Sequence, residues 1–429
     1  MRIVVIGGYG LIGGYVTARL VRDGHTVVGV GRDVRAARRR APGVEWVEGD
    51  LAAAGSDTWR PVLAGAGAVV NCAGALQDGP RDHLEGAHVA GLRTLIEAGV
   101  HAGVSRFIQV SAVGVEDGPG AFSRTKREAE EVLRGSDLDW VILRPGLVLA
   151  PAAYGGSALL RALAAFPWVT PLVHPGAIVQ VVSVEDVAEA VTRAARPDGP
   201  ARISVDIVAS RPTTLGELVA CLRAWLGLAP APVWAMPVAL VGLGARVADA
   251  LAWLGWQSPL RTTAIAQLAR GVRGEAGQCV RELGFAQRDL ETMLADWPAG
   301  VQERWFARLY FVKPLTLATL AGFWLASGLI GIARLDAAAR VLTGGGLDGG
   351  AARLSVLCGG VIDIGLGLLV CFRRTARPAL GGMLLVSAIY ILGTTIWRPD
   401  LWADPLGPIV KVAPAAVLAL AALAMMDER

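Results

Sequence analysis

Three glycines near the N-terminus have the spacing of a pyrophosphate-binding turn. They are Gly7, Gly10 and Gly13 in the stretch GGYGLIGG. The first glycine permits a tight turn, the second lets backbone N–H groups approach the anion, and the third lets a helix pack closely on a strand. The anion then lies at the helix N-terminus, where unpaired N–H groups and the helix dipole favour negative charge. Leu11 and Ile12, between the last two glycines, belong to the same predicted site; an ordinary left-handed turn is the alternative.

The segments around these glycines predict the elements that such a site requires. Residues 2–6 form a short apolar run rich in β-branched side chains, typical of a strand buried on both faces of a parallel sheet. A helical pattern follows over residues 15–22 and a second strand over 25–30, all within about 30 residues. Later strands alternate with helical stretches, at 68–71, 106–110 and 140–143. The sequence therefore predicts a Rossmann-type α/β domain with a doubly wound parallel sheet over residues 1–150.

Arg32 stands at the end of the second predicted strand, where an NAD site carries an acidic residue for the ribose 2′-hydroxyl. Arg35 and Arg38 follow close behind. Guanidinium groups pair well with phosphate, so the sequence favours NADP(H) over NAD(H), with Arg32 beside the 2′-phosphate. A solvated basic turn is the alternative interpretation.

Seven short motifs between residues 7 and 188 carry a family resemblance. They are Gly7-x-x-Gly10-x-x-Gly13, Gly49-Asp50-Leu51, Asn71-Cys72-Ala73-Gly74, Gln109-Val110-Ser111-Ala112, Thr125-Lys126, Arg144-Pro145-Gly146 and Val184-Glu185-Asp186-Val187-Ala188. In this order they resemble an atypical or extended short-chain dehydrogenase/reductase, close to the epimerase-like group that includes the NADPH-binding accessory subunit of respiratory complex I. The resemblance implies that Asp50 and Leu51 contact the adenine, and that Ala73 and Gly74 border the adenine and ribose.

The resemblance also raises a question about catalysis. In that superfamily a Tyr-x-x-x-Lys pair carries the proton chemistry with help from a serine, which implies catalytic roles for Ser111 and Lys126 and cofactor binding by Lys126. Phe122 stands four residues before Lys126, in the tyrosine's place, and phenylalanine has no proton to give. The alternative is that Ser111 and Lys126 only cap and pack. Spacing singles out none of the other candidates, Ser123, Tyr154, Glu116 and Asp117.

Residues 151–300 are less regular, as expected of the substrate-binding lobe of an extended member. Within them, residues 233–256 are apolar and long enough to span a bilayer, but a proline and two charged residues interrupt the run. We interpret this stretch as an amphipathic helix that touches the bilayer surface with Trp253 and Trp256. A buried core helix is the alternative. A surface helix would let a lipophilic substrate pass from the membrane to the cleft.

The C-terminal part of the chain predicts a membrane domain. Hydrophobic residues make up 53% of the sequence and charged residues 18%, with a mean hydropathy of +0.48, which exceeds that of ordinary soluble proteins. Four apolar spans approach the ~20 residues that cross a bilayer, at 315–333, 354–372, 379–397 and 406–426. We expect an all-α bundle of four transmembrane helices within residues 301–429. The run Pro405-Leu-Gly-Pro408-Ile-Val-Lys411 resembles the DoxX-like family of four-helix membrane proteins.

Basic residues at the span ends predict the orientation of this bundle. One group precedes the first span and another joins the second to the third: Arg304, Arg308 and Lys313, then Arg373, Arg374 and Arg377. Such clusters stay in the cytoplasm, although arginines in the opposite loops make the contrast moderate. Met1-Arg2 runs directly into the first strand, so we expect no signal peptide. The chain is predicted to be a multi-pass protein of the inner or plasma membrane with its N-terminal domain and C-terminus in the cytoplasm.

Two ionisable residues fall inside the spans, Asp363 in the second and Lys411 near the start of the fourth. Such residues usually face a bundle interior and find partners. The sequence leaves open whether these two pair or whether Lys411 extends to the interface. Small residues around Asp363 predict close helix packing, namely Gly359, Gly360, Gly365 and Gly367.

Two other functional classes are set aside. The formal charge of +4 is small and the arginines are spread along the chain, which argues against a nucleic-acid partner. The five cysteines and five histidines lack the spacing of metal ligands, so no metal site is expected.

The leading hypothesis is a membrane-anchored NADP(H)-dependent oxidoreductase that acts on a lipophilic or membrane-delivered substrate. The alternative is a non-catalytic NADPH-binding structural or redox-sensing subunit with a membrane-protein partner. Phe122 leaves open whether the protein is an enzyme.

Overall fold

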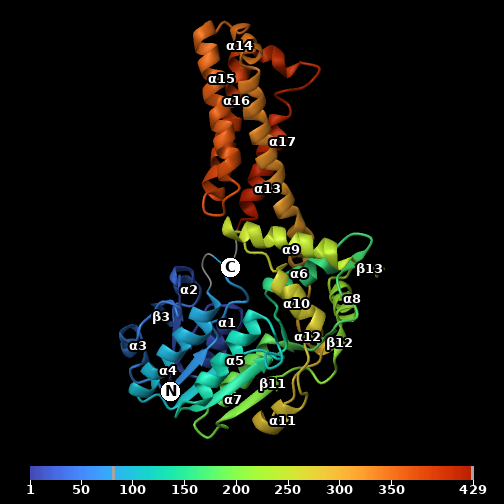
Figure 1. Ribbon diagram of the computed structural model, residues 1–429. Helices are drawn as coiled ribbons and strands as arrows, with labels where there is room; N and C mark the ends of the chain where they lie inside the picture. The colour runs from blue at the N-terminus through green and yellow to red at the C-terminus, as the bar shows by residue number, and fades with distance from the viewer. Residues whose placement is uncertain (80–82, 427–429) are drawn as a thin grey trace. The chain divides into compact units, whose positions relative to one another are not determined.

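The computed structural model describes residues 1–79 and 83–426, which divide into two compact units (Figure 1). The first unit contains residues 1–249 and 258–307, and the second contains residues 250–257 and those from 308 onward.

The first unit is built on a seven-stranded sheet in which every pairing is parallel. The strand order is β11-β6-β5-β4-β1-β2-β3, so the order reverses beside β1. Ligands of such sheets bind at the C-terminal ends of the strands next to this reversal. The strands are β1 (Arg2–Ile6), β2 (Thr26–Gly31), β3 (Glu45–Glu48), β4 (Ala68–Asn71), β5 (Arg106–Val110), β6 (Asp139–Pro145) and β11 (Ile203–Ile207).

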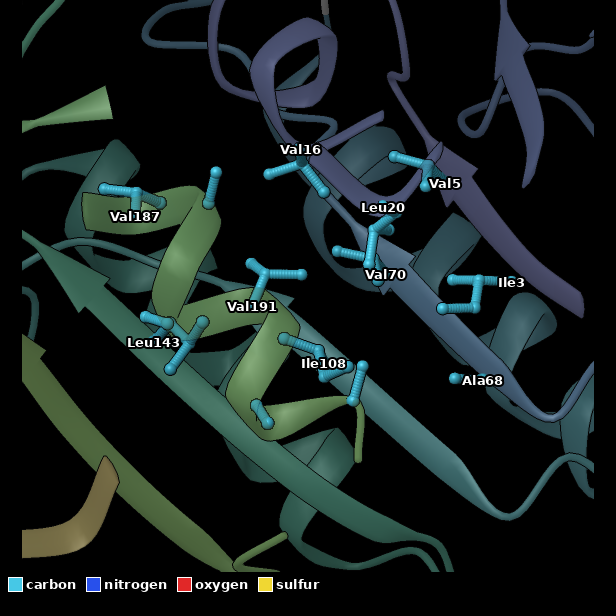
Figure 2. Close-up of a cluster of buried hydrophobic side chains, with 14 of the residues drawn as sticks. Ile3, Val5, Val16, Leu20, Ala68, Val70, Ile108, Leu143, Val187 and Val191 are labelled. Carbon is cyan, nitrogen blue, oxygen red and sulfur yellow. The ribbon is translucent and has the colours of Figure 1, made fainter. Parts of the chain in front are cut away.

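Helices cover both faces of this sheet because side chains alternate along each strand. Ile3 and Val5 of β1 pack with α1 (Leu11–Arg22) and α7 (Val184–Ala194), as Figure 2 shows. Val4 and Ile6 lie in a second cluster with helices from the opposite face, α3 (Ser56–Leu63), α4 (Gly91–His101) and α5 (Ala121–Arg134). The predicted Rossmann-type sheet is confirmed, and three predicted strands, at 2–6, 68–71 and 106–110, have the observed bounds.

The first helix differs from its prediction, since it begins at Leu11 rather than at residue 15. The glycine motif therefore continues into the helix. Because glycine has a low helix propensity, the sequence pattern did not predict a helix at these residues. The N-cap is Gly10, whose backbone is extended.

A third hydrophobic cluster is formed by residues from 149 to 307. The remaining strands of this part of the chain are β7 (Leu147–Leu149), β8 (Thr170–Leu172), β9 (Ile178–Val179), β10 (Val181–Ser183), β12 (Thr213–Thr214) and β13 (Val233–Ala235). Its helices are α6 (Gly155–Ala164), α8 (Leu215–Trp225), α9 (Val238–Trp253), α10 (Thr262–Arg270), α11 (Gln278–Leu283) and α12 (Leu290–Asp296). Two short helical elements, α2 (Arg35–Arg40) and η1 (Gly86–Ala90), complete the unit. A separate substrate lobe over residues 151–300 stays a prediction.

The second unit is a bundle of helices. Its members are α13 (Val301–Ala333) from residue 308 onward, α14 (Leu335–Thr343), α15 (Gly349–Leu369), α16 (Ala376–Trp397), η2 (Pro399–Trp402) and α17 (Val412–Ala424). Among the described residues, three helices are long and apolar enough to cross a membrane, α13, α15 and α16. The fourth predicted span is shorter than expected, because turns precede α17 and leave it 13 residues. That is about 20 Å of helix, against ~30 Å of hydrocarbon core.

Glycines bring α13 and α15 close together. A Cβ added to Gly328 would lie 2.4 Å from the carbonyl oxygen of Gly360, and one added to Gly367 would lie 2.8 Å from Leu325. Gly359 similarly leaves space for the hydroxyl of Tyr390, at 3.0 Å. The predicted role of the small residues is confirmed at three of the four glycines; Gly365 has no neighbour within 4 Å.

Asp363 lies among these helices with its carboxylate buried. One oxygen accepts a hydrogen bond from Ser327 of α13 and the other accepts one from Tyr390 of α16, each at 2.9 Å. Lys411 is exposed just before α17. The partners of Asp363 are therefore hydroxyl groups of two neighbouring helices, and the Asp363–Lys411 pair that the sequence left open is not formed.

Candidate cofactor site

The predicted cofactor residues meet at one edge of the sheet. Neighbouring parallel strands end in register, with Ile6 opposite Asn71 and Asn71 opposite Gln109. Residues that follow these ends must therefore lie at the same edge. They include Gly7 after β1, Arg32 after β2, Asp50 and Leu51 after β3, Ala73 and Gly74 after β4, and Ser111 after β5.

The glycine turn fits so closely that two of its members admit no side chain. Gly7 has a φ of +71°, and an added Cβ would lie 3.0 Å from the backbone nitrogen of Ala73. A Cβ on Gly13 would lie only 2.1 Å from the carbonyl oxygen of Gly7. Gly10 closes the turn by donating its N–H to that same oxygen at 2.9 Å. The turn is thus held against the end of β4 on one side and against α1 on the other.

The N-terminus of α1 is open to an anion. Its N-cap, Gly10, supplies no side-chain hydrogen bond, and no acidic residue lies in the first turn. The N–H groups of Leu11 and Ile12 have no partner within the helix, by the geometry of any α-helix. The glycine turn and the positive end of the α1 dipole together form a site that fits the pyrophosphate of a dinucleotide.

Tyr9 is a feature of the turn that its sequence pattern did not reveal. Its ring lies over Gly31, where an added Cβ would lie 2.1 Å from the ring, and its hydroxyl accepts a hydrogen bond from Asp33 N–H at 3.3 Å. Arg32, between these two residues, is exposed at the end of β2. Of the following arginines, Arg38 donates to the carbonyl of Trp46 at 3.0 Å. Arg32 is therefore the arginine that directly follows the strand end at the edge.

Asp50 and Leu51 have local roles in the structure. Asp50 accepts a hydrogen bond from the N–H of Ala52 at 3.0 Å, which shapes the turn after β3. Leu51 is buried in the second hydrophobic cluster. Their predicted contact with adenine stays a prediction.

Lys126 reaches the edge from α5 and is 6% exposed. Its ammonium group donates to the carbonyl of Val110 at 3.1 Å. A Cβ on Gly74 would lie 3.2 Å from this nitrogen, so the glycine leaves room for the lysine. Burial lowers the pKa of Lys126 to about 8, against the opposing effect of Glu130 and Cys72.

His88 lies beside Lys126 and was missed by the sequence analysis. Its Nε2 accepts the N–H of Ala75 at 3.2 Å, which assigns the ring proton to Nδ1, 2.8 Å from the Thr125 hydroxyl. Thr125 in turn donates to the carbonyl of Phe122 at 3.2 Å. Burial and the charge of Lys126 lower the pKa of His88 to about 3, so the ring is neutral and is not a proton donor at neutral pH.

Phe122 occupies the position of the missing tyrosine and packs edge-on against His88, with ring centroids 6.0 Å apart. The other candidate donors have different surroundings. Ser123 is buried and accepts a hydrogen bond from Gln267 at 3.1 Å, while Glu116 pairs with Arg144 at 2.7 Å. Tyr154 is exposed at the start of α6, and Asp117 lies in the loop before α5.

Ser111 has a buried partner that its motif did not predict. Its hydroxyl donates to Glu130 at 2.6 Å, and Glu130 is 1% exposed. Arg144 donates to the same carboxylate through Nε at 3.0 Å and Nη2 at 2.5 Å, and Arg134 donates to it at 2.9 Å. The proton of Ser111 is thus directed into a structural ion pair, and a catalytic role for Ser111 stays a prediction.

Replacing Lys126 with methionine is expected to stabilise the cofactor-free protein at pH 7. The folded-state pKa of about 8 lies below the ordinary value of 10.5, so the unfolded state binds more protons between these values. The free energy of unfolding of the wild type therefore rises with pH between these two pKa values. The extra stability of Lys126→Met is greatest below pH 8 and disappears near pH 10.5. Thermal unfolding of the detergent-solubilised chain at several pH values measures this. Arg93→Met, at an exposed position of α4, should show no such pH dependence; a lower unfolding temperature for Lys126→Met at pH 7 would contradict the expectation.

Both parts of the chain match known families. Residues 7–196 match the NAD(P)H-binding family and residues 321–420 match the DoxX-like family. No curated protein sequence matches the chain.

Solved structures similar to the chain share its fold at low sequence identity. The WbmG enzyme of Bordetella bronchiseptica, in complex with NAD, is 17% identical with a TM-score of 0.54, over 69% of this chain and 92% of its own. The NADPH-dependent quinone oxidoreductase QOR2 of Escherichia coli, in complex with NADPH, is 19% identical with a TM-score of 0.54, over 68% and 99%. The UDP-glucose 4-epimerase of Thermotoga maritima, with UDP-glucose, is 20% identical with a TM-score of 0.53, over 73% and 100%.

The matches agree with the two structural units. The NAD(P)H-binding match contains the glycine turn, Gly74 and Lys126, and the DoxX-like match lies within the apolar helices of the second unit. The chain therefore joins a region that matches the NAD(P)H-binding family, and has the fold of these solved structures, to an apolar helical region that matches the DoxX-like family.

Proposed function

We propose that this protein is a membrane-anchored, NADP(H)-dependent oxidoreductase that reduces a lipophilic, membrane-delivered substrate. The observation that carries this proposal is the intact cofactor edge, in which the glycine turn closes against Ala73 while Lys126 lies beside Gly74. In this proposal Gly7, Gly10, Leu11, Ile12 and Gly13 hold the pyrophosphate.

The remaining cofactor contacts follow the same edge. Arg32 binds the 2′-phosphate, Ala73 and Gly74 border the adenine and ribose, and Asp50 and Leu51 lie at the adenine. The ammonium group of Lys126 holds the nicotinamide ribose, since its Nζ already lies near Gly74. The nicotinamide would supply a hydride to the substrate.

The absence of a tyrosine at position 122 favours a quinone as the substrate class. An alkoxide formed from a ketone needs a proton donor in the site. A reduced quinone is an aromatic hydroquinone anion, whose delocalised charge lets it take its proton from water. Quinones also dissolve in bilayers, in keeping with the apolar helices of the second unit.

The membrane part of the proposal adds α17 as a fourth crossing and places both chain ends in the cytoplasm. The support is the basic loop between α15 and α16, which contains Arg373 and Arg374. Residues 399–411 extend the short α17 with turns and a 3-10 helix.

A second function, a non-catalytic NADPH-binding subunit, is favoured by one observation. Ser111 donates its hydroxyl to Glu130, and Phe122 has no proton to donate. In this second function neither residue acts on a carbonyl. Such a subunit would transmit nucleotide occupancy to a membrane-protein partner.

The two functions are distinguished by incubating the purified chain with NADPH and a panel of quinones, lipid ketones and aldehydes. Following the absorbance of the reduced nicotinamide, we expect consumption with quinones and none with ketones. Phe122→Tyr should add ketone reduction while leaving quinone reduction in place. If NADPH binds but no substrate consumes it, and Phe122→Tyr creates the first activity, the binding-subunit function is correct.

Cofactor choice is tested by reversing the charge at the end of β2. Arg32→Asp should weaken NADPH binding by about tenfold or more, because one charge-assisted bond to phosphate is worth about 1.5–3 kcal/mol. NADH binding should change little. Arg39→Asp makes the same charge change on the exposed side of α2 and should affect neither. An equal loss of NADPH and NADH with Arg32→Asp would contradict the 2′-phosphate assignment.

A further inference from the structure

Helix α9 carries apolar side chains on an exposed face. We define the exposed stripe as Leu240, Leu243, Val247 and Leu251, all exposed and spaced along one side of the helix. The opposite side is buried and carries Val241, Ala245, Ala248 and Ala252. The alternative of a wholly buried core helix is therefore wrong, because all four residues of the stripe are exposed.

Of the two charged residues of α9, Arg246 is exposed and Asp249 lies off the stripe. Asp249 points to the inner side, where its carboxylate accepts hydrogen bonds from Arg261 at 2.5 Å and from Thr262 at 2.7 Å. Gln77, in the loop that follows Gly74, also donates to Asp249, at 3.2 Å. This half-buried charge is thus paired, and it fixes α9 to the loop beside the cofactor edge.

Exposed tryptophan residues flank the exposed stripe at both ends of α9. Trp234 of β13, with Val233, precedes the helix and is exposed. Trp168, beside the strand β8 that pairs with β13, is 85% exposed. Trp253 ends the helix with 76% exposure. Tryptophan at the margins of an apolar surface is characteristic of segments that lie at the membrane–water interface.

The last turn of α9 belongs to the unit that contains the membrane helices. Leu254 accepts the N–H of Arg373 at 3.0 Å, and the indole N–H of Trp256 donates to Cys371 at 2.7 Å. Cys371 and Arg373 lie between α15 and α16, at one end of the apolar spans. Trp256 is half-buried, with Arg373 over its ring at 5.6 Å, and packs against the bundle core, so its contact with the bilayer surface stays a prediction.

We infer that α9 is an interfacial helix whose exposed stripe is inserted into the cytoplasmic surface of the lipid bilayer. The occupant of the stripe is lipid because the last turn of the helix bonds to residues at the end of the membrane spans and exposed tryptophans flank the stripe. Each buried apolar side chain contributes about 1.5–3 kcal/mol, which favours insertion of all four. This inference concerns membrane contact alone and holds whether or not the protein turns over a substrate.

Lipid-attached quenchers test this inference on the full-length chain. In a background without native cysteines, Leu243→Cys is labelled with a small fluorophore and reconstituted into phosphatidylcholine–phosphatidylglycerol vesicles containing a lipid with a doxyl group near the headgroup. Val100→Cys, exposed on α4, is the matched control outside the stripe, and Leu385→Cys, exposed on α16, is the control within the spans. NADPH binding and thermal unfolding confirm that each variant is folded.

We expect the doxyl lipid to remove most of the fluorescence at Leu243→Cys, as at Leu385→Cys, and little at Val100→Cys. Aqueous iodide should quench only the label at Val100→Cys. If iodide quenches Leu243→Cys as strongly as Val100→Cys, the stripe lies in water and the inference fails. If neither quencher reaches Leu243→Cys, a second copy or another protein covers the stripe, and the lipid assignment is equally overturned.

Discussion

Gly13→Ala is expected to lower the affinity for NADPH and NADH by on the order of 100-fold, or about 2–3 kcal/mol, the value of one or two charge-assisted hydrogen bonds. The added Cβ would lie 2.1 Å from the carbonyl oxygen and 2.9 Å from the carbonyl carbon of Gly7. These are backbone atoms, so they cannot rotate away as a side chain would. The turn must shift, and the N–H groups that surround the pyrophosphate lose their alignment.

The next residue provides a matched control for this substitution. A Cβ on Gly14 would have its nearest neighbours at 3.9 Å, an ordinary contact distance. Gly14→Ala should therefore keep cofactor affinity, and its higher helix propensity should stabilise α1 by about 1 kcal/mol. Titration of NADPH fluorescence measures the affinity and thermal unfolding measures the stability. Equal affinities for Gly13→Ala and the wild type would exclude the glycine turn as the pyrophosphate site.

The parts of the site that the sequence predicted are those determined by local pattern. The glycine spacing and the apolar strands fix the edge of the sheet because parallel strands end together, and this places Gly7 at that edge without knowledge of distant contacts. Gly74 and Lys126 were expected there from the family resemblance alone. Phe122 was likewise evident from its spacing to Lys126.

The parts that could not be predicted depend on partners far apart in the chain. His88 bonds to Thr125, 37 residues away, and Asp249 bonds to Gln77, 172 residues away. Such pairs leave no periodic signal. Glu130 did leave one, because it follows Lys126 by one helical turn and so lies on the buried side of α5. A carboxylate on a buried helix face requires a cation, and that signal was overlooked.

The hydropathy pattern also predicted a longer fourth helix than the one observed. The apolar run from 406 to 426 contains Pro408 and the positive-φ Gly407, and these residues form turns before α17 begins. A hydropathy window counts apolar side chains and does not register that a proline disfavours helix in the residue before it.

Glu130→Ala is expected to destabilise the first unit by about 3–5 kcal/mol, the cost of removing one partner from a buried ion pair. The substitution leaves the guanidinium of Arg144 without its buried carboxylate, and Glu116, its remaining partner, is largely exposed. Glu131→Ala, at the exposed neighbouring position, should change stability by about 0.5 kcal/mol or less. Thermal unfolding without cofactor distinguishes the two variants.

The double variant Glu130→Leu with Arg144→Met separates the ion pair from a general packing defect. Apolar residues of similar volume often replace a buried ion pair at little cost, so the double variant should recover most of the stability lost in Glu130→Ala. It also frees the hydroxyl of Ser111 from its acceptor. If the double variant remains as unstable as Glu130→Ala, the loss comes from packing and the ion pair is not what stabilises this edge. If the recovered protein combined with Phe122→Tyr reduces ketones faster than Phe122→Tyr alone, the ion pair holds the Ser111 hydroxyl away from the substrate.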